Sequence, residues 1–346
     1  VQPDHVASLT NLARMWGMKY VYTADPEGPR RAIQYAKRAL RVAPDSVETL
    51  VWLGYALFQM DEYDEASKNF NKALAIDPGH HAAAYFCASH LLFPMHGPET
   101  HWSRREVQPL GSAAKTPQTV RLEEAVRLFQ IAVRDPRKSG FSWLGLGVCH
   151  SELGHFEDGL WCMEQARRIE IGAEGFGLAG IDGYIGECLR LCGRLEEARR
   201  RVMAGLKQVE KSDHFYRDTL RGVHLNTLGK IGLERGARAA ARAAFRQAVQ
   251  HLRGRSKARG AGQLLVQALA GQARTDADAA AFGKARQLFQ ERRDYNFAFM
   301  WGCREDVSLL ELARAAWAVG ELDLARDYLK RARASGGLEA LREVLE

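Results

Sequence analysis

The chain has 346 residues, of which 46% are hydrophobic and 26% are charged, so it can bury a sizeable core. No stretch approaches the roughly 18 to 20 consecutive apolar residues of a membrane helix, which excludes a membrane span, and no secretory signal opens the chain. The net charge of +7 suggests acidic or phosphate-bearing partners without requiring them.

The content of cysteine and proline narrows the class further. The six cysteines lie inside apolar or helical runs without a disulfide-framework spacing, which favours reduced thiols and a cytoplasmic location. Only ten prolines occur, and runs of β-branched residues are scarce. Both features favour an all-α protein.

Small residues and prolines recur at a fixed interval from the N-terminal part onward. The interval is 34 residues between the members of three pairs, namely Ala32 and Ala66, Ala39 and Ala73, and Pro44 and Pro78. This spacing resembles the tetratricopeptide repeat, a 34-residue helix–turn–helix unit. Residues 47–80 carry its large and small positions best, and the longer intervals later in the chain resemble looser repeats of the same kind.

The physical reason for the pattern is close helix packing. We expect Gly54 and Ala66 to lie where the two helices of the unit cross, because small side chains let the backbones approach. Phe70 then fills the groove that Ala73 leaves open. Pro78 ends the second helix, since it lacks an N–H group and clashes with the preceding turn.

The resemblance implies a right-handed α-solenoid, or superhelix, of about eight such units over residues 1–336. A short C-terminal capping helix is expected at 337–346. The units are expected near 13–46, 47–80, 81–138, 140–173, 179–212, 222–255, 260–292 and 306–339.

The unit at 81–138 contains an inserted loop at 94–119 with no helical period. The segment is either a surface loop or a lid over the concave groove. As a lid, its candidate contacts are His96, His101, Trp102, Arg104 and Arg105.

Metal and enzyme chemistry are weakly indicated. Cys87 and His90 have a zinc-like spacing, with His96 and His101 following, but a second tight pair is lacking, so a buried thiol beside loop histidines is the favoured explanation. The chain has no phosphate loop, nucleophile elbow or HExxH motif. The GxGxxG match at 175–180 follows a helix rather than a strand. We therefore expect no enzyme activity, no cofactor and no metal ligands.

The family register places certain first-helix positions on the concave wall of the solenoid. These positions hold aromatic residues in the N-terminal part and polar residues further on, which suits a peptide or protein segment with acidic or carboxylate groups. A second interpretation is that some rings only bridge adjacent repeats. The groove candidates are Tyr55, Phe58, Tyr85, Phe93, Glu187, Arg190, Asn226, Lys230, Arg314 and Trp317.

A basic stripe forms the second candidate surface. From Arg235 to Arg274 there are nine Lys or Arg residues and no Asp or Glu. Such a stripe can meet phosphates, although a solvated convex face is the alternative. No aromatic residues interleave with the charges of the loop that follows the second helix, so base stacking is unsupported. The stripe at 235–259 contains Arg238, Arg242, Arg246, Arg253, Arg255, Lys257 and Arg259.

Three functions stay open at this point. The favoured one is a peptide-binding scaffold or regulatory interaction module that uses the concave groove, as part of a larger signalling protein. The alternatives are a nucleic-acid-associated regulator that uses the basic stripe, or a small-molecule or metal site under the inserted loop. The sequence does not predict an oligomeric state.

Overall fold

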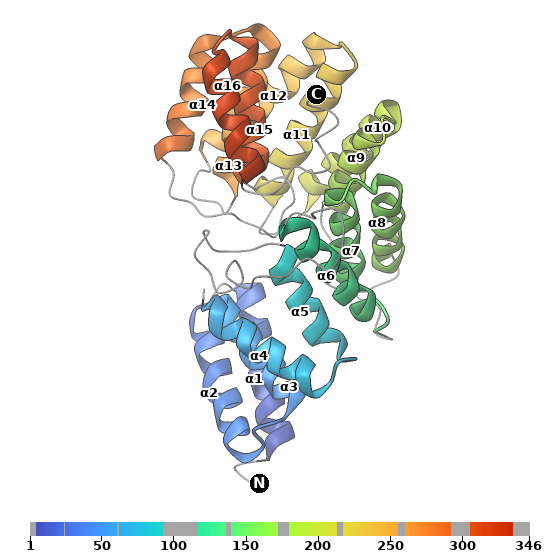
Figure 1. Cartoon of the computed structure of the whole chain (residues 1–346), viewed down its shortest axis with the longest axis vertical. Helices are drawn as coiled ribbons and strands as arrows, with labels where there is room; N and C mark the ends of the chain where they lie inside the picture. The colour runs from blue at the N-terminus through green and yellow to red at the C-terminus, as the bar shows by residue number, and fades with distance from the viewer. Residues whose placement is uncertain are drawn as a thin grey trace. The chain divides into compact units, whose positions relative to one another are not determined.

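The structure, a computed structural model, describes residues 5–23, 25–60, 62–92, 117–135, 140–171, 180–212, 217–254, 260–291 and 305–334. These ranges contain sixteen α-helices and no strand (Figure 1). The predicted all-α fold is therefore confirmed. No helix within these ranges is both long enough and apolar enough to cross a bilayer.

The helices follow one another along the chain. They are α1 (Val6–Thr23), α2 (Glu27–Val42), α3 (Val47–Gln59), α4 (Tyr63–Ile76), α5 (His81–Leu92), α6 (Pro117–Ala132), α7 (Gly140–Glu152), α8 (Phe156–Ile171), α9 (Ile181–Leu191), α10 (Leu195–Lys211), α11 (Arg217–Glu234), α12 (Arg238–Arg253), α13 (Ala261–Asp276), α14 (Ala279–Glu291), α15 (Glu305–Ala318) and α16 (Leu322–Ala334).

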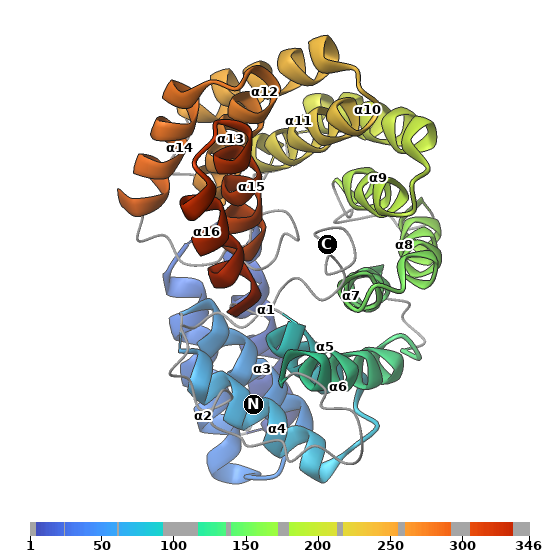
Figure 2. The same ribbon diagram turned by 45° about the horizontal axis from the view of Figure 1, so that its top comes forward.

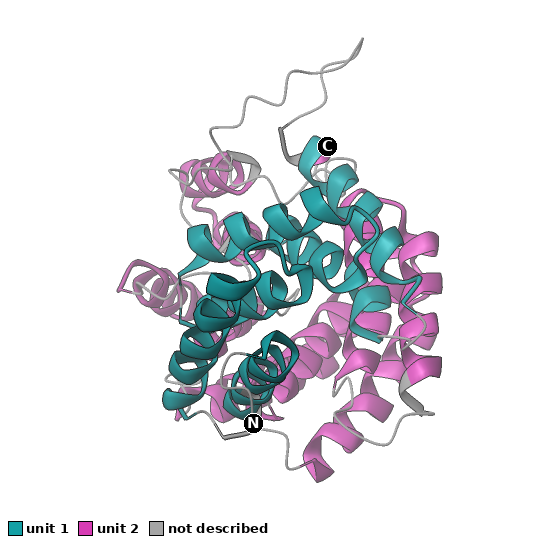
Figure 3. Ribbon diagram, turned by 90° about the horizontal axis from the view of Figure 1, so that it is seen from below, with its two compact units in different colours: residues 1–114, 120–145 teal, residues 115–119, 146–346 magenta. Residues whose placement is uncertain are grey.

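The chain divides into two compact units (Figure 3). Unit 1 comprises residues 1–114 and 120–145, and unit 2 comprises residues 115–119 and 146–346. Consecutive helices pack as hairpins in both units, with α1 on α2 and α3 on α4 in unit 1, and α9 on α10, α11 on α12, α13 on α14 and α15 on α16 in unit 2.

Glycines on the first helices let aromatic rings of the second helices approach the backbone. A Cβ atom added at Gly54 would lie only 2.6 Å from the ring of Phe70. In unit 2, a Cβ atom at Gly229 would lie 2.5 Å from the ring of Phe245. Both rings are almost fully buried, so these hairpins close by seating a ring over a glycine.

The turns inside the hairpins of unit 2 repeat one backbone motif. The N–H of Arg194 donates to the C=O of Leu189 at 2.9 Å, and Gly193 between them has a φ of 75°. This is the Schellman arrangement, in which a left-handed residue ends the helix and satisfies its last carbonyl groups. Glycine holds the same place elsewhere in unit 2, with positive φ at Gly154, Gly236 and Gly320.

The α13–α14 turn departs from glycine. Ala277 takes the left-handed position there with a φ of 50°, and the N–H of Asp278 donates to the C=O of Ala273 at 3.1 Å. A Cβ atom in this conformation is strained, because it approaches the neighbouring carbonyl oxygen. The motif therefore persists where the preferred residue is missing.

The first helices of unit 2 form its inner layer. Helix α9 contacts α11, α11 contacts α13, and α13 contacts α15, whereas no two second helices of unit 2 make comparable contact within the described ranges. The hairpins are therefore closer together along the first helices, so this side of unit 2 is concave. In Figure 2, α9, α11, α13 and α15 follow the inner side of the curve of unit 2.

Two predicted features lie outside the described residues. They are the capping helix at 337–346 and the inserted loop at 94–119 up to residue 116; α6 begins at Pro117. The division into eight repeats with these boundaries stays a prediction.

Candidate peptide-binding face

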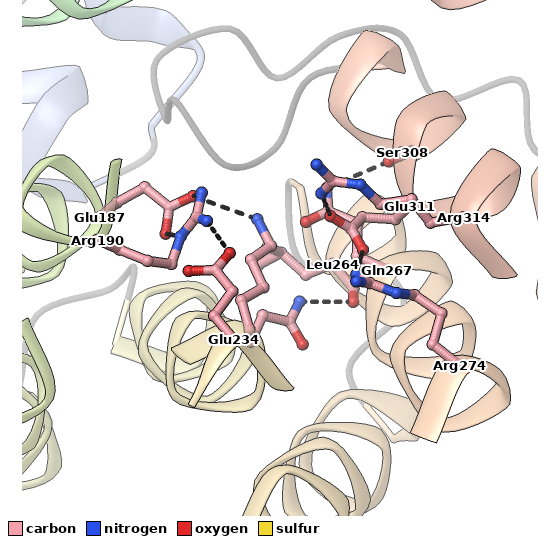
Figure 4. Close-up of polar contacts among 11 residues, drawn as sticks. Glu187, Arg190, Glu234, Leu264, Gln267, Arg274, Ser308, Glu311 and Arg314 are labelled. Atoms are coloured by element: carbon pink, nitrogen blue, oxygen red, sulfur yellow. Dashed lines mark hydrogen bonds and ion pairs between the residues drawn. The ribbon is translucent and has the colours of Figure 1, made fainter. Parts of the chain in front are cut away.

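The inner side of unit 2 carries charged side chains that pair between neighbouring hairpins (Figure 4). Glu187 and Arg190 lie one turn apart on α9 and form a two-pronged ion pair, with Arg190 Nη2 at 2.9 Å and Nε at 3.1 Å. Helix α11 adds Lys230, whose Nζ lies 3.4 Å from Glu187 Oε1, and Glu234, which pairs with Arg190. The four side chains therefore tie α9 to α11.

A second cluster ties α13 to α15. Arg274 on α13 donates to Glu311 on α15 at 2.8 Å, and Arg314, one turn further along α15, pairs with the other oxygen at 3.0 Å. The Glu311 side chain is only 2% exposed. Together, the two clusters contain four cations and three carboxylates, which we call the inner-face charges.

The carboxylates of Glu187 and Glu311 stay ionised. Burial raises the pKa of Glu187, but Arg190 and Lys230 outweigh it and hold this pKa well below the usual range. Burial acts on Glu311 in the same way, and Arg274 and Arg314 lower the pKa of Glu311 to about 2. At neutral pH the inner-face charges therefore carry one net positive charge.

Two amide side chains on the same layer have acceptors without a partner. Asn226 is buried on α11, and its Nδ2 donates to the C=O of Leu264 at 2.9 Å. Its Oδ1 accepts no hydrogen bond from the described part of the chain, and neither does Oε1 of the buried Gln263 on α13. Buried acceptors usually have partners, so these two atoms are exceptions among the described residues.

The predicted aromatic residues of unit 1 pack mainly against other rings. Tyr85 on α5 lies edge-on to Phe86 and to Phe129 on α6, with ring centroids 5.1 and 6.1 Å away. Tyr55 on α3 also lies against Phe86, at 5.1 Å. Burial raises the pKa of Tyr85 to about 12. The rings of Tyr55 and Tyr85 therefore bridge neighbouring helices of unit 1 and are half-buried.

The other predicted groove residues differ in their surroundings. Phe58 packs against Tyr63 within one hairpin, with ring centroids 5.4 Å apart. Trp317 on α15 is 68% exposed, whereas Arg314 belongs to the second charge cluster. Phe93 lies outside the described residues. The structure therefore gathers Glu187, Arg190 and Lys230 in one place, and leaves the role of the whole predicted set untested.

Three charged residues of this face were missed by sequence reasoning. Glu234 was passed over although it ends the same helix as Lys230. Arg274 lies in the irregular unit near 260–292, where the repeat register is unclear. Glu311 stands three residues before Arg314, as Glu187 does before Arg190, and this shared spacing was an available signal.

The basic stripe follows one side of α12. Arg238, Arg242 and Arg246 line an open cleft of about 660 Å³, together with Arg274, Thr275, Asp276, Ala277 and Ala318. Arg242 is held by Asp276, whose Oδ1 lies 2.7 Å from Arg242 Nε, while Arg238 and Arg246 are exposed. Arg253 is exposed at the end of α12, and Arg255, Lys257 and Arg259 lie outside the described residues.

The residues considered for zinc and for a lid are only partly described. Cys87 and His90 are both buried on α5, and burial raises the pKa of the Cys87 thiol to about 12. The remaining members of that set lie outside the described residues, namely His96, His101, Trp102, Arg104 and Arg105.

Comparison with solved structures gives low similarity. PilW, described as a widely conserved type IV pilus biogenesis factor, is 17% identical with a TM-score of 0.49 over 69% of this chain and 91% of its own. TTC0263, a thermophilic tetratricopeptide repeat protein of Thermus thermophilus, is 20% identical with a TM-score of 0.45 over 64% and 98%. YrrB, described as a repeat protein with an unusual peptide-binding site, is 15% identical with a TM-score of 0.41 over 62% and 91%. At these values, the similarities carry no argument about function.

Comparison at the sequence level is more direct. No curated protein matches this chain. The family model of the tetratricopeptide repeat matches residues 47–80, which are the residues of hairpin α3–α4 and its flanking turns. Residues 47–80 are therefore a tetratricopeptide repeat, and consecutive helices of both units pack as hairpins like the one that this repeat forms.

Proposed function

We propose that the chain is a non-catalytic interaction module and that the inner layer of unit 2 binds an extended peptide segment of a partner protein. Repeat proteins of this architecture commonly mediate protein–protein interaction. The observation that carries the proposal is the pair of buried, unpartnered acceptors Asn226 Oδ1 and Gln263 Oε1. The N–H groups of an extended peptide are suitable donors to both once the side chains that cover these atoms move aside, since neither atom is exposed.

The charges of the face favour a segment that carries carboxylates. The surplus cation lies in the α13–α15 cluster, where Arg274 and Arg314 share the single carboxylate of Glu311, whereas the α9–α11 cluster is neutral. Glu234 is the most exposed of the three carboxylates, so a carboxylate of the partner can compete with it for Arg190. Hydrogen bonds between ionised groups are shorter and stronger than neutral ones, so this contact would select acidic segments.

The wider setting belongs to the same proposal. We take the eight-unit division near the predicted boundaries as the repeat plan, and a regulatory role within a larger cytoplasmic signalling protein as the setting. Cys87, Cys162, Cys188 and Cys192 are free thiols, which agrees with a reducing compartment.

Peptide selection tests the proposal. A random-sequence peptide library displayed on phage is selected against the full chain, and the enriched peptides are measured by fluorescence anisotropy. We expect enrichment of Asp or Glu, and at least a tenfold loss of affinity in Asn226→Ala and Lys230→Met. The matched control Lys330→Met changes an exposed lysine on α16 and is expected to bind normally. Equal binding by all three variants would place recognition elsewhere.

A second candidate function rests on the cleft beside α12. Because Arg238 and Arg246 are exposed on either side of the Arg242–Asp276 pair, they are available to phosphate groups. Anisotropy with a labelled single-stranded oligonucleotide at low salt tests this. Binding that disappears in the double variant Arg238→Glu, Arg246→Glu supports it, and no binding by the unaltered chain rejects it.

A further inference from the structure

Three side chains with metal-binding atoms meet at the turn between α7 and α8 in unit 2. His150 lies in the last turn of α7, His155 in the connecting turn and Asp158 in the first turn of α8. One ligand atom from each residue lies within 4.8 Å of those of the other two. The grouping is independent of the inner-face charges, which lie on α9, α11, α13 and α15.

The backbone of the hairpin turn holds the two histidines together. The N–H of His155 donates to the C=O of His150 at 2.9 Å, which is the same bond that Arg194 makes to Leu189 in the next hairpin. The two imidazole rings consequently lie side by side, with centroids 6.1 Å apart. The turn motif therefore brings residues 150 and 155 together whatever their side chains are.

The side chain at position 150 is unusual for this motif. The equivalent residues are Leu189 in the α9–α10 turn and Ala316 in the α15–α16 turn, and both are fully buried and apolar. His150 places an imidazole there, and its Nδ1 is buried without any hydrogen-bond partner in the described ranges. A polar atom in this state is normally avoided, so packing alone does not explain the histidine.

We propose that His150, His155 and Asp158 bind a divalent transition-metal ion of the zinc type. Two imidazole nitrogens and one carboxylate oxygen are a common three-ligand set for Zn²⁺, with water in the fourth position. His155 and Asp158 are exposed, so their side chains can rotate to shorten the ligand spacing. The ion would link the end of α7 to the start of α8.

This proposal departs from the absence of metal ligands expected from the sequence. That expectation considered Cys87 and the histidines that follow it. The new set has separations of five and three residues, which match no short metal motif. It becomes visible only when the turn motif brings positions 150 and 155 together.

Titration with zinc tests the proposal. The full chain, stripped with a chelator, is titrated with ZnCl₂ by isothermal calorimetry and heated with and without zinc. Compared with His155→Arg or Asp158→Asn, we expect the unaltered chain to bind one more zinc equivalent, or to bind that equivalent at least tenfold more tightly. We also expect zinc to raise the Tm of the unaltered chain. His80→Gln is the matched control, because His80 also faces a carboxylate, Glu48 at 3.3 Å, but is not part of a described three-ligand group.

A second variant separates metal binding from packing. His150→Leu restores the apolar residue that the next hairpin carries as Leu189, so we expect a higher Tm without zinc and a smaller response to zinc. Unchanged zinc stoichiometry, affinity and Tm response in His150→Leu and His155→Arg, with normal circular dichroism, would overturn the proposal. Loss of the response in His80→Gln as well would also overturn it, since the effect would then not be specific to this turn.

Discussion

The ring of Phe245 offers a sharp test of how these hairpins close. The ring lies between two glycines, Gly229 on its own hairpin partner α11 and Gly271 on the next first helix, α13. A Cβ atom at Gly229 would stand 2.5 Å from the ring, and the ring cannot retreat because Gly271 is in contact on its other side. Gly229→Ala is therefore expected to destabilise unit 2.

The magnitude follows from two opposing effects. Replacing glycine by alanine inside a helix gains about 1 kcal/mol in helix propensity. Forcing an extra methyl group into a packed core costs about 1 to 3 kcal/mol. The net loss for Gly229→Ala is therefore up to about 2 kcal/mol. The control Gly283→Ala, on α14 with nothing within 4 Å of the added Cβ, should keep the propensity gain of about 0.5–1 kcal/mol.

Urea unfolding followed by circular dichroism measures both variants. A third comparison introduces Gly229→Ala into a Phe245→Leu background, where the smaller side chain leaves room for the methyl group. We expect the cost of Gly229→Ala to shrink or change sign there. If Gly229→Ala and Gly283→Ala stabilise the protein equally, the ring does not depend on the glycine, and the account of hairpin closure is wrong.

Three further predictions concern unit 2. The pKa of Glu311 is about 2 in the folded chain, against a usual 4.5. The ionised side chain therefore stabilises the fold by about 3 kcal/mol, in full above about pH 4.5, and this contribution is lost as the pH falls toward 2. In Glu311→Gln, the free energy of unfolding should change less with pH over that range. In urea unfolding, Gly193→Ala should lower the free energy of unfolding by about 1 kcal/mol and Ala277→Gly should raise it by up to about 1 kcal/mol. Only the second change relieves a left-handed alanine, so a change of the same sign in both variants would contradict this reasoning. Glu234→Gln should increase the affinity of selected acidic peptides several-fold in anisotropy, because Arg190 loses a competing carboxylate; unchanged affinity would argue against this route.

The repeat itself could be predicted because its signals are local. Gly54, Ala66, Phe70 and Pro78 lie within one 34-residue unit, and the family model matches the same residues, 47–80. A small residue, a ring and a helix end each have a physical consequence within the hairpin that contains them. The all-α fold followed from these consequences and from the composition.

The arrangement of the candidate face could be predicted only in part. The repeat register assigned Glu187, Arg190 and Lys230 to the inner layer. This was possible because the register is read from the sequence of one hairpin at a time. It did not show that Lys230 and Arg190 share the carboxylate of Glu187, because that contact depends on how two hairpins stack. Arg274 was missed because the irregular spacing of its unit hides the register.

The inner-face charges have a consequence for specificity. Buried ion pairs rarely stabilise more than apolar residues of the same size, since each charge loses its water. Helix α13 shows the apolar alternative, with Leu264, Leu265 and Leu269 all buried. The charges at the α9–α11 and α13–α15 contacts therefore contribute something in addition to stability.

The inner-face charges determine how neighbouring hairpins pair. Glu187 meets Lys230 of the next hairpin and Arg274 meets Glu311 of the next, so each contact is satisfied in only one register of stacking. In an array where each repeat touches only its neighbours, a register fixed at each contact also fixes the spacing of Asn226 and Gln263 along the inner layer. A peptide that needs both acceptors would then meet them already in position, and the binding free energy would not be spent on ordering the hairpins.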